Sequence, residues 1–174
     1  MSAQEILLRD YQAPAFLIST VHLFFDVQTD GVQVTSTLQI ERQPHTPKTE
    51  PLVLDGVGLT LHSVALNEQP LSSPAYMVTS EHLTIPTTED RFTLRIVTDL
   101  KPAWNTRLEG LYQSLSGLCT QCEAQGFRHI TYYLDRPDVL AKFTVRIEAS
   151  QDRYPILLSN GNQIGQGILE NEQY

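Results

Sequence analysis

The sequence contains only two cysteines and one tryptophan among 174 residues, and it is poor in basic residues. The two cysteines, Cys119 and Cys122, are too few for a disulfide framework. Twelve Lys and Arg residues stand against 20 Asp and Glu, which gives a formal net charge of −8, and the basic residues do not cluster. This balance argues against nucleic acid and anionic membranes as partners, because phosphate binding requires clustered cations.

Long apolar runs are also missing. The first residues lack the basic and then apolar segments of a secretory signal, and no run approaches the ~20 apolar residues that a bilayer-spanning helix needs. We therefore expect a cytoplasmic protein with reduced thiols and no membrane association. At about 150 residues per domain, the chain length predicts a single domain over 1–174, and a hydrophobic fraction of 41% is enough for one core.

Alternating apolar and polar residues predict β-strands along most of the chain. Apolar residues occupy odd positions over 21–27 and even positions within 32–40, with Asp30-Gly31 between them, which is typical of a β-hairpin. A proline-rich exposed loop is expected over 43–51. Further strands are predicted at 52–54, 59–66, 76–78, 82–85, 92–97, 130–134, 143–147 and 154–158. This spacing favours a sandwich of antiparallel or mixed sheets, with one helical turn at 137–141.

Residues 101–128 keep neither the period of a strand nor that of a helix. Pro102, Gly110, Gly117 and Gly126 are scattered among polar residues in this stretch. It is predicted to be a long structured loop with short strands, and loops of this length in compact domains are often functional.

Motifs that carry chemistry are scarce. The five histidines are not spaced for metal binding, and Cys119, Cys122 and His129 supply three zinc ligands where a structural site needs four. A redox C-x-x-C motif is expected between a strand and a helix, whereas loop residues flank this one, so two free thiols are predicted. Nucleophile-elbow, phosphate-loop and dinucleotide-binding motifs are absent. Carboxylates around Arg128 and Arg136 predict an ion-pair network that holds a loop: Glu123, Asp135 and Asp138.

Three segments have distinctive sequences: LEGLYQS at 108–114, CTQCEAQGFRHITYYLDRPD at 119–138 and YPILLSNGN at 154–162. They closely resemble the N-terminal domain of the bacterial aminopeptidase N family, which are zinc metallo-aminopeptidases of the gluzincin type. Weaker similarity at 10–14 and 91–94 extends the resemblance over essentially the whole chain. The expected fold is therefore an all-β, saddle-like sandwich of antiparallel and mixed sheets with little helix and a long irregular loop at about 101–128.

The resemblance also implies what this chain lacks. The family's zinc-binding H-E-x-x-H helix and its G-A-M-E-N strand belong to the next domain, and no position here matches either. We therefore expect this chain to bind no catalytic zinc and to hydrolyse nothing alone, while the full-length protein uses zinc to remove single N-terminal residues from peptides. The chain also ends before the family's last aromatic strand, so it is expected to be a fragment whose partner is its own catalytic domain.

The resemblance assigns a substrate-binding function to Glu123 and Gln121, which would bind the free α-amine of the peptide. A carboxylate supplies the opposite charge, and an amide oxygen can accept a further N–H. The resemblance also implies a cis peptide bond between Glu123 and Ala124. Ala124, Arg128, Asp135 and Arg136 are expected to support the loop.

Two alternatives remain open at this stage. The chain could be a free-standing β-sandwich module that binds a peptide or a carbohydrate through exposed aromatic residues such as Trp104 and Tyr112. Alternatively, Cys119 and Cys122 could have a redox function, which would require a strongly lowered thiol pKa.

Overall fold

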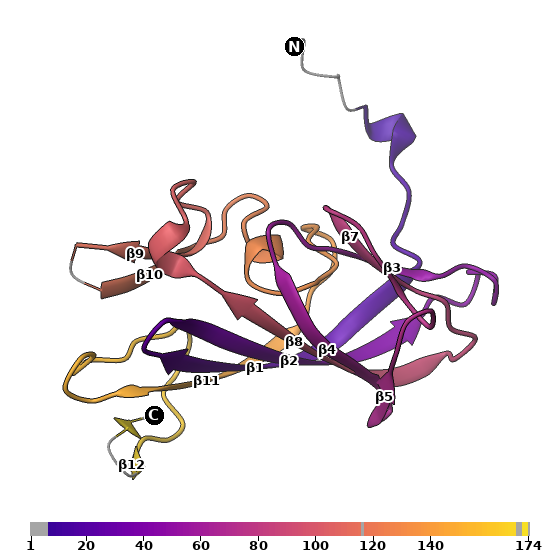
Figure 1. Cartoon of the computed structure of the whole chain (residues 1–174). Coiled ribbons are helices and arrows are strands. Elements are labelled where there is room, and N and C mark those ends of the chain that lie inside the picture. The colour runs from indigo at the N-terminus through magenta and orange to yellow at the C-terminus, as the bar shows by residue number, and fades with distance from the viewer. Residues whose placement is uncertain (1–6, 116, 170–171, 174) are drawn as a thin grey trace.

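The structure is a computed structural model, which describes residues 7–115, 117–169 and 172–173. Its largest sheet has the strand order β12-β13-β11-β1-β2-β8-β4-β5 (Figure 1). The strands of this sheet are β1 (Phe16–Gln28), β2 (Gly31–Arg42), β4 (Thr60–Leu66), β5 (Gln69–Leu71), β8 (Arg91–Leu100), β11 (Lys142–Ser150), β12 (Ile168–Leu169) and β13 (Glu172–Gln173).

The predicted hairpin is the centre of this sheet. β1 and β2 pair antiparallel from Phe16 opposite Arg42 to Gln28 opposite Gly31, so two residues form the turn. On its other side β1 pairs in parallel with β11, from Thr20 opposite Lys142 onward, which makes the sheet mixed.

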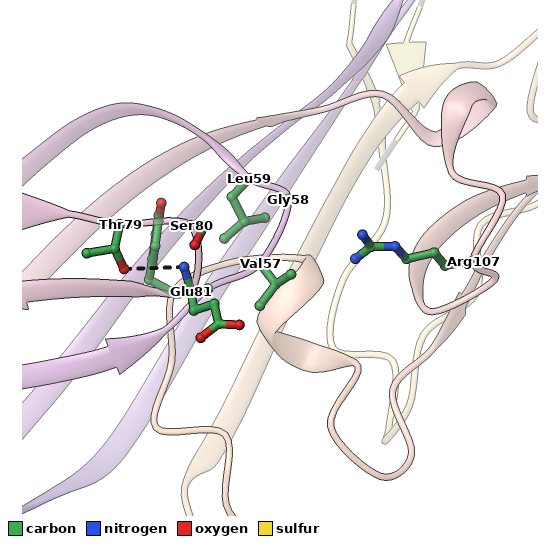
Figure 2. Close-up of a pocket in the computed structure, with 9 residues that line it drawn as sticks. Val57, Gly58, Leu59, Thr79, Ser80, Glu81 and Arg107 are labelled. Atoms are coloured by element: carbon green, nitrogen blue, oxygen red, sulfur yellow. Dashed lines mark hydrogen bonds between the residues drawn. The ribbon is translucent and has the colours of Figure 1, made fainter. Parts of the chain in front are cut away.

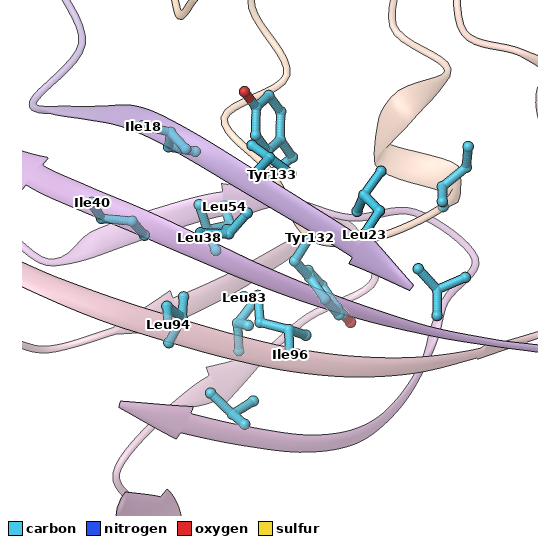
Figure 3. Close-up of a cluster of buried hydrophobic side chains, with 14 of the residues drawn as sticks. Ile18, Leu23, Leu38, Ile40, Leu54, Leu83, Leu94, Ile96, Tyr132 and Tyr133 are labelled. Atoms are coloured by element: carbon cyan, nitrogen blue, oxygen red, sulfur yellow. The ribbon is translucent and has the colours of Figure 1, made fainter. Parts of the chain in front are cut away.

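A smaller sheet covers one face of the large one. It consists of β3 (Leu52–Asp55), β7 (His82–Ile85) and β6 (Met77–Val78), in the order β3-β7-β6. In β3 and β7 every second side chain is buried, as expected for strands with one solvated face, whereas both residues of β6 are exposed. Leu38 and Ile96 of the large sheet contribute to one buried cluster with Leu54 and Leu83 of the small sheet (Figure 3). The all-β sandwich with antiparallel and mixed sheets is thereby confirmed.

The stretch 101–128 contains a separate two-stranded ribbon, β9 (Gly110–Ser114) with β10 (Gly117–Gln121), as the prediction of short strands implied. The short 3-10 helices are η1 (Leu8–Asp10), η2 (Pro102–Trp104) and η3 (Phe127–His129). None of the helices within the described residues has the length and apolar character needed to span a membrane.

The prediction of a strand at 130–134 was wrong. The apolar residues Ile130, Tyr132 and Tyr133 are buried in the core as part of an irregular segment. Figure 3 shows Tyr132 and Tyr133 among the side chains of the core. An isolated bridge satisfies the main chain of Tyr133, which exchanges two N–H···O bonds with Asp55 at 2.8 and 3.0 Å.

Two other predicted elements are also absent. Residues 154–158 lie mainly exposed after a turn in which the Tyr154 N–H donates to the Ser150 carbonyl, and they pair with no strand among the described residues. Residues 137–141 form no helix. Residues 137–138 make a turn in which the Val139 N–H donates to the Arg136 carbonyl at 3.2 Å, and residues 139–141 continue as irregular chain. Strand β5, which contains Pro70, was not predicted.

Candidate substrate-amine site

The ribbon β9–β10 leads directly into the segment with Gln121 and Glu123, the two residues for which the family resemblance implies substrate binding. Gln121 is the last residue of β10, opposite Gly110, and residues 121–124 form what we call the anchor loop. The chain then turns back sharply, as the Gly126 N–H donates to the Cys122 carbonyl at 2.8 Å. A Cβ at Gly126 would lie 2.5 Å from the Gln121 carbonyl oxygen and 2.8 Å from the Cys122 Cα, so this turn requires glycine.

Glu123 and Gln121 both have exposed side chains on this loop. The carboxylate of Glu123 has neither a hydrogen bond nor an ion pair with any of the residues that the structure describes. The Gln121 amide N–H donates a long, 3.5 Å bond to the Glu123 main-chain carbonyl, which leaves the amide oxygen available as an acceptor. The Glu123–Ala124 peptide bond is cis, as the resemblance implied.

Arg128 does not pair with Glu123. Its guanidinium Nε donates to the Asp135 carboxylate at 2.9 Å, Nη2 donates to the Asp135 carbonyl at 3.1 Å, and Asp55 lies 3.7 Å away. The Arg128 main-chain N–H also donates to Asp135. Both partners are largely buried, with side-chain exposures of 21% and 11%. This pair therefore links η3 to the segment before β11, which leaves Glu123 outside the network.

His129 attaches the same segment to two other loops. Its Nδ1 lies 2.9 Å from the Val57 carbonyl, and its Nε2 lies 3.4 Å from the Glu109 carboxylate at the start of the ribbon. The Val57 N–H in turn donates to the Arg128 carbonyl at 2.9 Å. The Arg128–Asp135 ion pair, the His129 contacts and the bond from the Val57 N–H together hold the residues after the anchor loop against the rest of the domain.

Three buried hydroxyl groups, which sequence reasoning missed, fix the next residues to the large sheet. Ser36 Oγ of β2 and Thr131 Oγ1 lie 2.8 Å apart, and Thr98 Oγ1 of β8 donates to the Ile130 carbonyl at 3.0 Å. All three hydroxyl side chains belong to fully buried residues. The only sequence signal for these bonds was that Ser36 and Thr98 occupy positions where the strand alternation expects an apolar residue. Their partners, Thr131 and Ile130, lie far away in the chain.

Burial also determines the electrostatics behind the anchor loop. Burial, and to a smaller extent the Asp135 charge, raises the pKa of Tyr133 to about 12 and also raises the pKa of the Cys122 thiol. The Tyr133 ring packs edge-on against Phe127 with centroids 4.9 Å apart. A raised thiol pKa reduces the thiolate fraction, which opposes the redox alternative. Both cysteines are free thiols.

Arg136 and Asp138 form a second ion pair. Arg136 donates to both Asp138 oxygens, at 2.6 and 2.7 Å, and to the Gln12 carbonyl at 2.7 Å. The Tyr11 hydroxyl donates to Asp138 at 2.9 Å. These bonds hold the N-terminal segment against the turn before β11, so Arg136 supports the chain's entry into β1. Among the described residues it forms no hydrogen bond or ion pair with the anchor loop.

A hollow of about 450 Å³ is lined in part by Val57 and Leu59 (Figure 2). Glu81 and Arg107 line it from two loops, and in Figure 2 their charged groups lie on either side of Val57. The Glu81 main-chain N–H donates a hydrogen bond to the Thr79 hydroxyl at 3.3 Å. None of the residues assigned to amine binding lines this hollow. Within the described part of the chain, no group of three or more His, Cys, Asp or Glu residues could hold a metal ion.

The two aromatic residues of the binding-module alternative differ in exposure. Trp104 of η2 is 85% exposed, whereas Tyr112 of β9 is half-buried.

Comparison with known proteins identifies the family of this chain. Residues 11–174 match the peptidase M1 N-terminal domain. The chain belongs to this family. It is 50% identical over 165 residues to aminopeptidase N of Escherichia coli, covering 95% of this chain and 18% of that protein. It is 43% identical to aminopeptidase N of Caulobacter vibrioides, covering 98% of this chain and 20% of that protein.

Solved structures of the M1 family share its fold. Legionella pneumophila aminopeptidase A, in complex with aspartic acid, superposes with a TM-score of 0.88 at 30% identity, over 95% of this chain and 20% of that one. A mutant M1 zinc metallopeptidase of Deinococcus radiodurans, bound to a Tyr-Ser-Ala substrate, has a TM-score of 0.72 at 17% identity, covering 91% of this chain and 38% of that one. The chain therefore spans about a fifth of the length of the curated relatives that it matches.

Proposed function

We propose that this M1 N-terminal domain covers the active site of a zinc-dependent aminopeptidase and that Glu123, with Gln121, binds the α-ammonium group of the peptide substrate. The observation that carries the proposal is the Glu123 carboxylate, which is exposed and unpaired among the described residues while Arg128 is engaged with Asp135. The zinc and the residues that use it would be supplied by a part of the full-length protein outside this chain.

The chemistry of the anchor loop suits an ammonium ligand. The α-amine titrates near ~8, and an adjacent carboxylate favours its charged form, so the recognised species is abundant at neutral pH. The free Gln121 amide oxygen can accept a second N–H of the same group. One fixed carboxylate would then set the distance from the peptide's first nitrogen to the reacting bond, which accounts for removal of one residue at a time.

The rest of the domain supports this geometry through contacts behind the loop. The Arg128–Asp135 pair, the His129 contacts and the buried Thr131 hydroxyl hold the chain from η3 onward, while the two side chains that would bind the amine remain exposed. A rigid support of this kind lowers the entropic cost of binding, because the carboxylate is positioned before the substrate arrives.

The test uses the full-length protein and two substrates, a free-amine peptide and its N-acetylated analogue. A hydrogen bond to a charge contributes about 1.5–3 kcal/mol, so Glu123→Gln should lower kcat/KM for the free amine by about tenfold to 150-fold. The same substitution should scarcely change the slow cleavage of the acetylated peptide. Glu50→Gln, which neutralises another exposed glutamate, is the matched control. An unchanged kcat/KM for the free amine in Glu123→Gln would refute the proposal.

A further inference from the structure

A second cavity, of about 490 Å³, lies where the β1–β2 turn, η2, the β9–β10 ribbon and the residues after β11 meet. In Figure 1 these segments gather at the end of the molecule opposite β5. Much of the wall is apolar, formed by residues such as Val27, Val32, Trp104 and Leu118. A volume of this size lies in the range of small-molecule sites in proteins.

Two cations border the cavity without a carboxylate partner. Lys101 Nζ donates to the Asp30 carbonyl at 2.7 Å, and Arg153 Nη1 donates to the Thr29 carbonyl at 3.0 Å. Neither forms an ion pair with any residue that the structure describes. An ammonium has three N–H donors and a guanidinium five, so both groups keep unused donors.

The position of Lys101 depends on a close backbone approach. A Cβ at Gly31 would lie 2.6 Å from the Leu100 carbonyl oxygen and 3.4 Å from the Lys101 side chain. Glycine therefore allows the lysine to lie across the β1–β2 turn, where its ammonium reaches the Asp30 carbonyl. The guanidinium of Arg153 is also held, with its central carbon 5.6 Å from the Tyr154 ring centroid.

The charges of the lining indicate a monoanion. Asp30 also lines the cavity, so the formal charges of Asp30, Lys101 and Arg153 sum to one positive. A phosphate group carries a charge of about −1.5 to −2 and would be only partly neutralised here. The exposed Trp104 indole and the aliphatic wall favour an apolar body attached to the anion, because covering them removes apolar surface from water.

We propose that this cavity binds a carboxylate attached to a small apolar group. Such a group occurs both in a free apolar carboxylic acid and at the C-terminal residue of a peptide. The inference goes beyond the proposed function, since no residue of the anchor loop lines the cavity.

Trp104 provides a direct assay, because it is the only tryptophan of the chain and lines the cavity. The probes are isocaproate, its neutral analogue isocaproamide, and the acetylated dipeptide N-acetyl-alanyl-leucine with a free C-terminal carboxylate, none of which has an aromatic ring. We expect a saturable change in Trp104 emission with isocaproate that is absent with isocaproamide. Saturation with the dipeptide as well identifies a peptide C-terminus as a second source, and its failure to bind restricts the site to free acids.

Charge variants locate the binding to this cavity. Lys101→Gln and Arg153→Gln should each weaken isocaproate binding by about threefold to tenfold, and rising salt should weaken it further. Arg95→Gln removes the same charge from an exposed position that does not line the cavity and should leave the affinity unchanged. No saturable change with either acid, equal binding of acid and amide, or equal weakening in all three variants would each overturn the proposal. If a variant unfolds, the comparison of acid with amide in the unchanged protein still decides.

Discussion

The buried hydroxyl pair of Ser36 and Thr131 provides the sharpest test of how the chain behind the anchor loop is held. Thr131→Val removes the hydroxyl at nearly constant volume and leaves Ser36 Oγ buried without a partner, since its 2.8 Å contact is with Thr131. A buried hydroxyl without a partner costs about 1–3 kcal/mol. Ser36→Ala should cost a similar amount for the same reason. The double variant, in which neither hydroxyl remains, should cost less than the sum of the two single variants.

Urea unfolding followed by far-UV circular dichroism measures these costs. With an m-value of about 2 kcal/mol/M, each single substitution should lower the urea midpoint by about 0.5–1.5 M at unchanged m. The coupling energy from the double-mutant cycle should be about 1 kcal/mol or more. Thr37→Val, on the same strand but with no side-chain hydrogen bond to any described residue, is the control and should change stability by less than about 0.5 kcal/mol. Additive single effects, with zero coupling, would refute the assignment of one shared hydrogen bond.

Two further predictions concern the turn and the N-terminal attachment. Gly126→Ala should destabilise the chain by about 1–3 kcal/mol in the same urea assay, because its Cβ would meet main-chain atoms, whereas Gly165→Ala, with no neighbour within 4 Å, should be close to neutral; equal effects would contradict this account. Hydrogen bonds from Arg136 and Tyr11 hold the pKa of Asp138 at about 2 instead of 3.8, so this contact stabilises the fold above about pH 4 and is lost as pH falls toward 2. An NMR titration of the Asp138 carboxyl group with a midpoint near pH 4 would disprove this lowering of the pKa.

The candidate site was accessible from the sequence only through resemblance. Composition and spacing predicted an ion-pair network around Arg128, and the structure has one, but its members are Asp135 and Asp55 and exclude Glu123. A carboxylate five residues from an arginine gives no local indication of which acid the arginine binds. That choice depends on η3 and on the fold that brings Asp55 to the same place.

The local sequence pattern was enough to predict where strands form. Which strands pair, and which buried segments stay irregular, depends on residues far away in the chain. The hairpin of β1 and β2 and strand β7 were predictable because alternation and a two-residue turn act over a few residues. The parallel pairing of β1 with β11 joins positions more than 100 residues apart, and no local signal encodes it. Residues 130–134 have the composition of a strand, yet Thr98 and Asp55 bond the main chain of Ile130 and Tyr133 and Ser36 bonds the Thr131 hydroxyl, so burial without a ladder becomes stable.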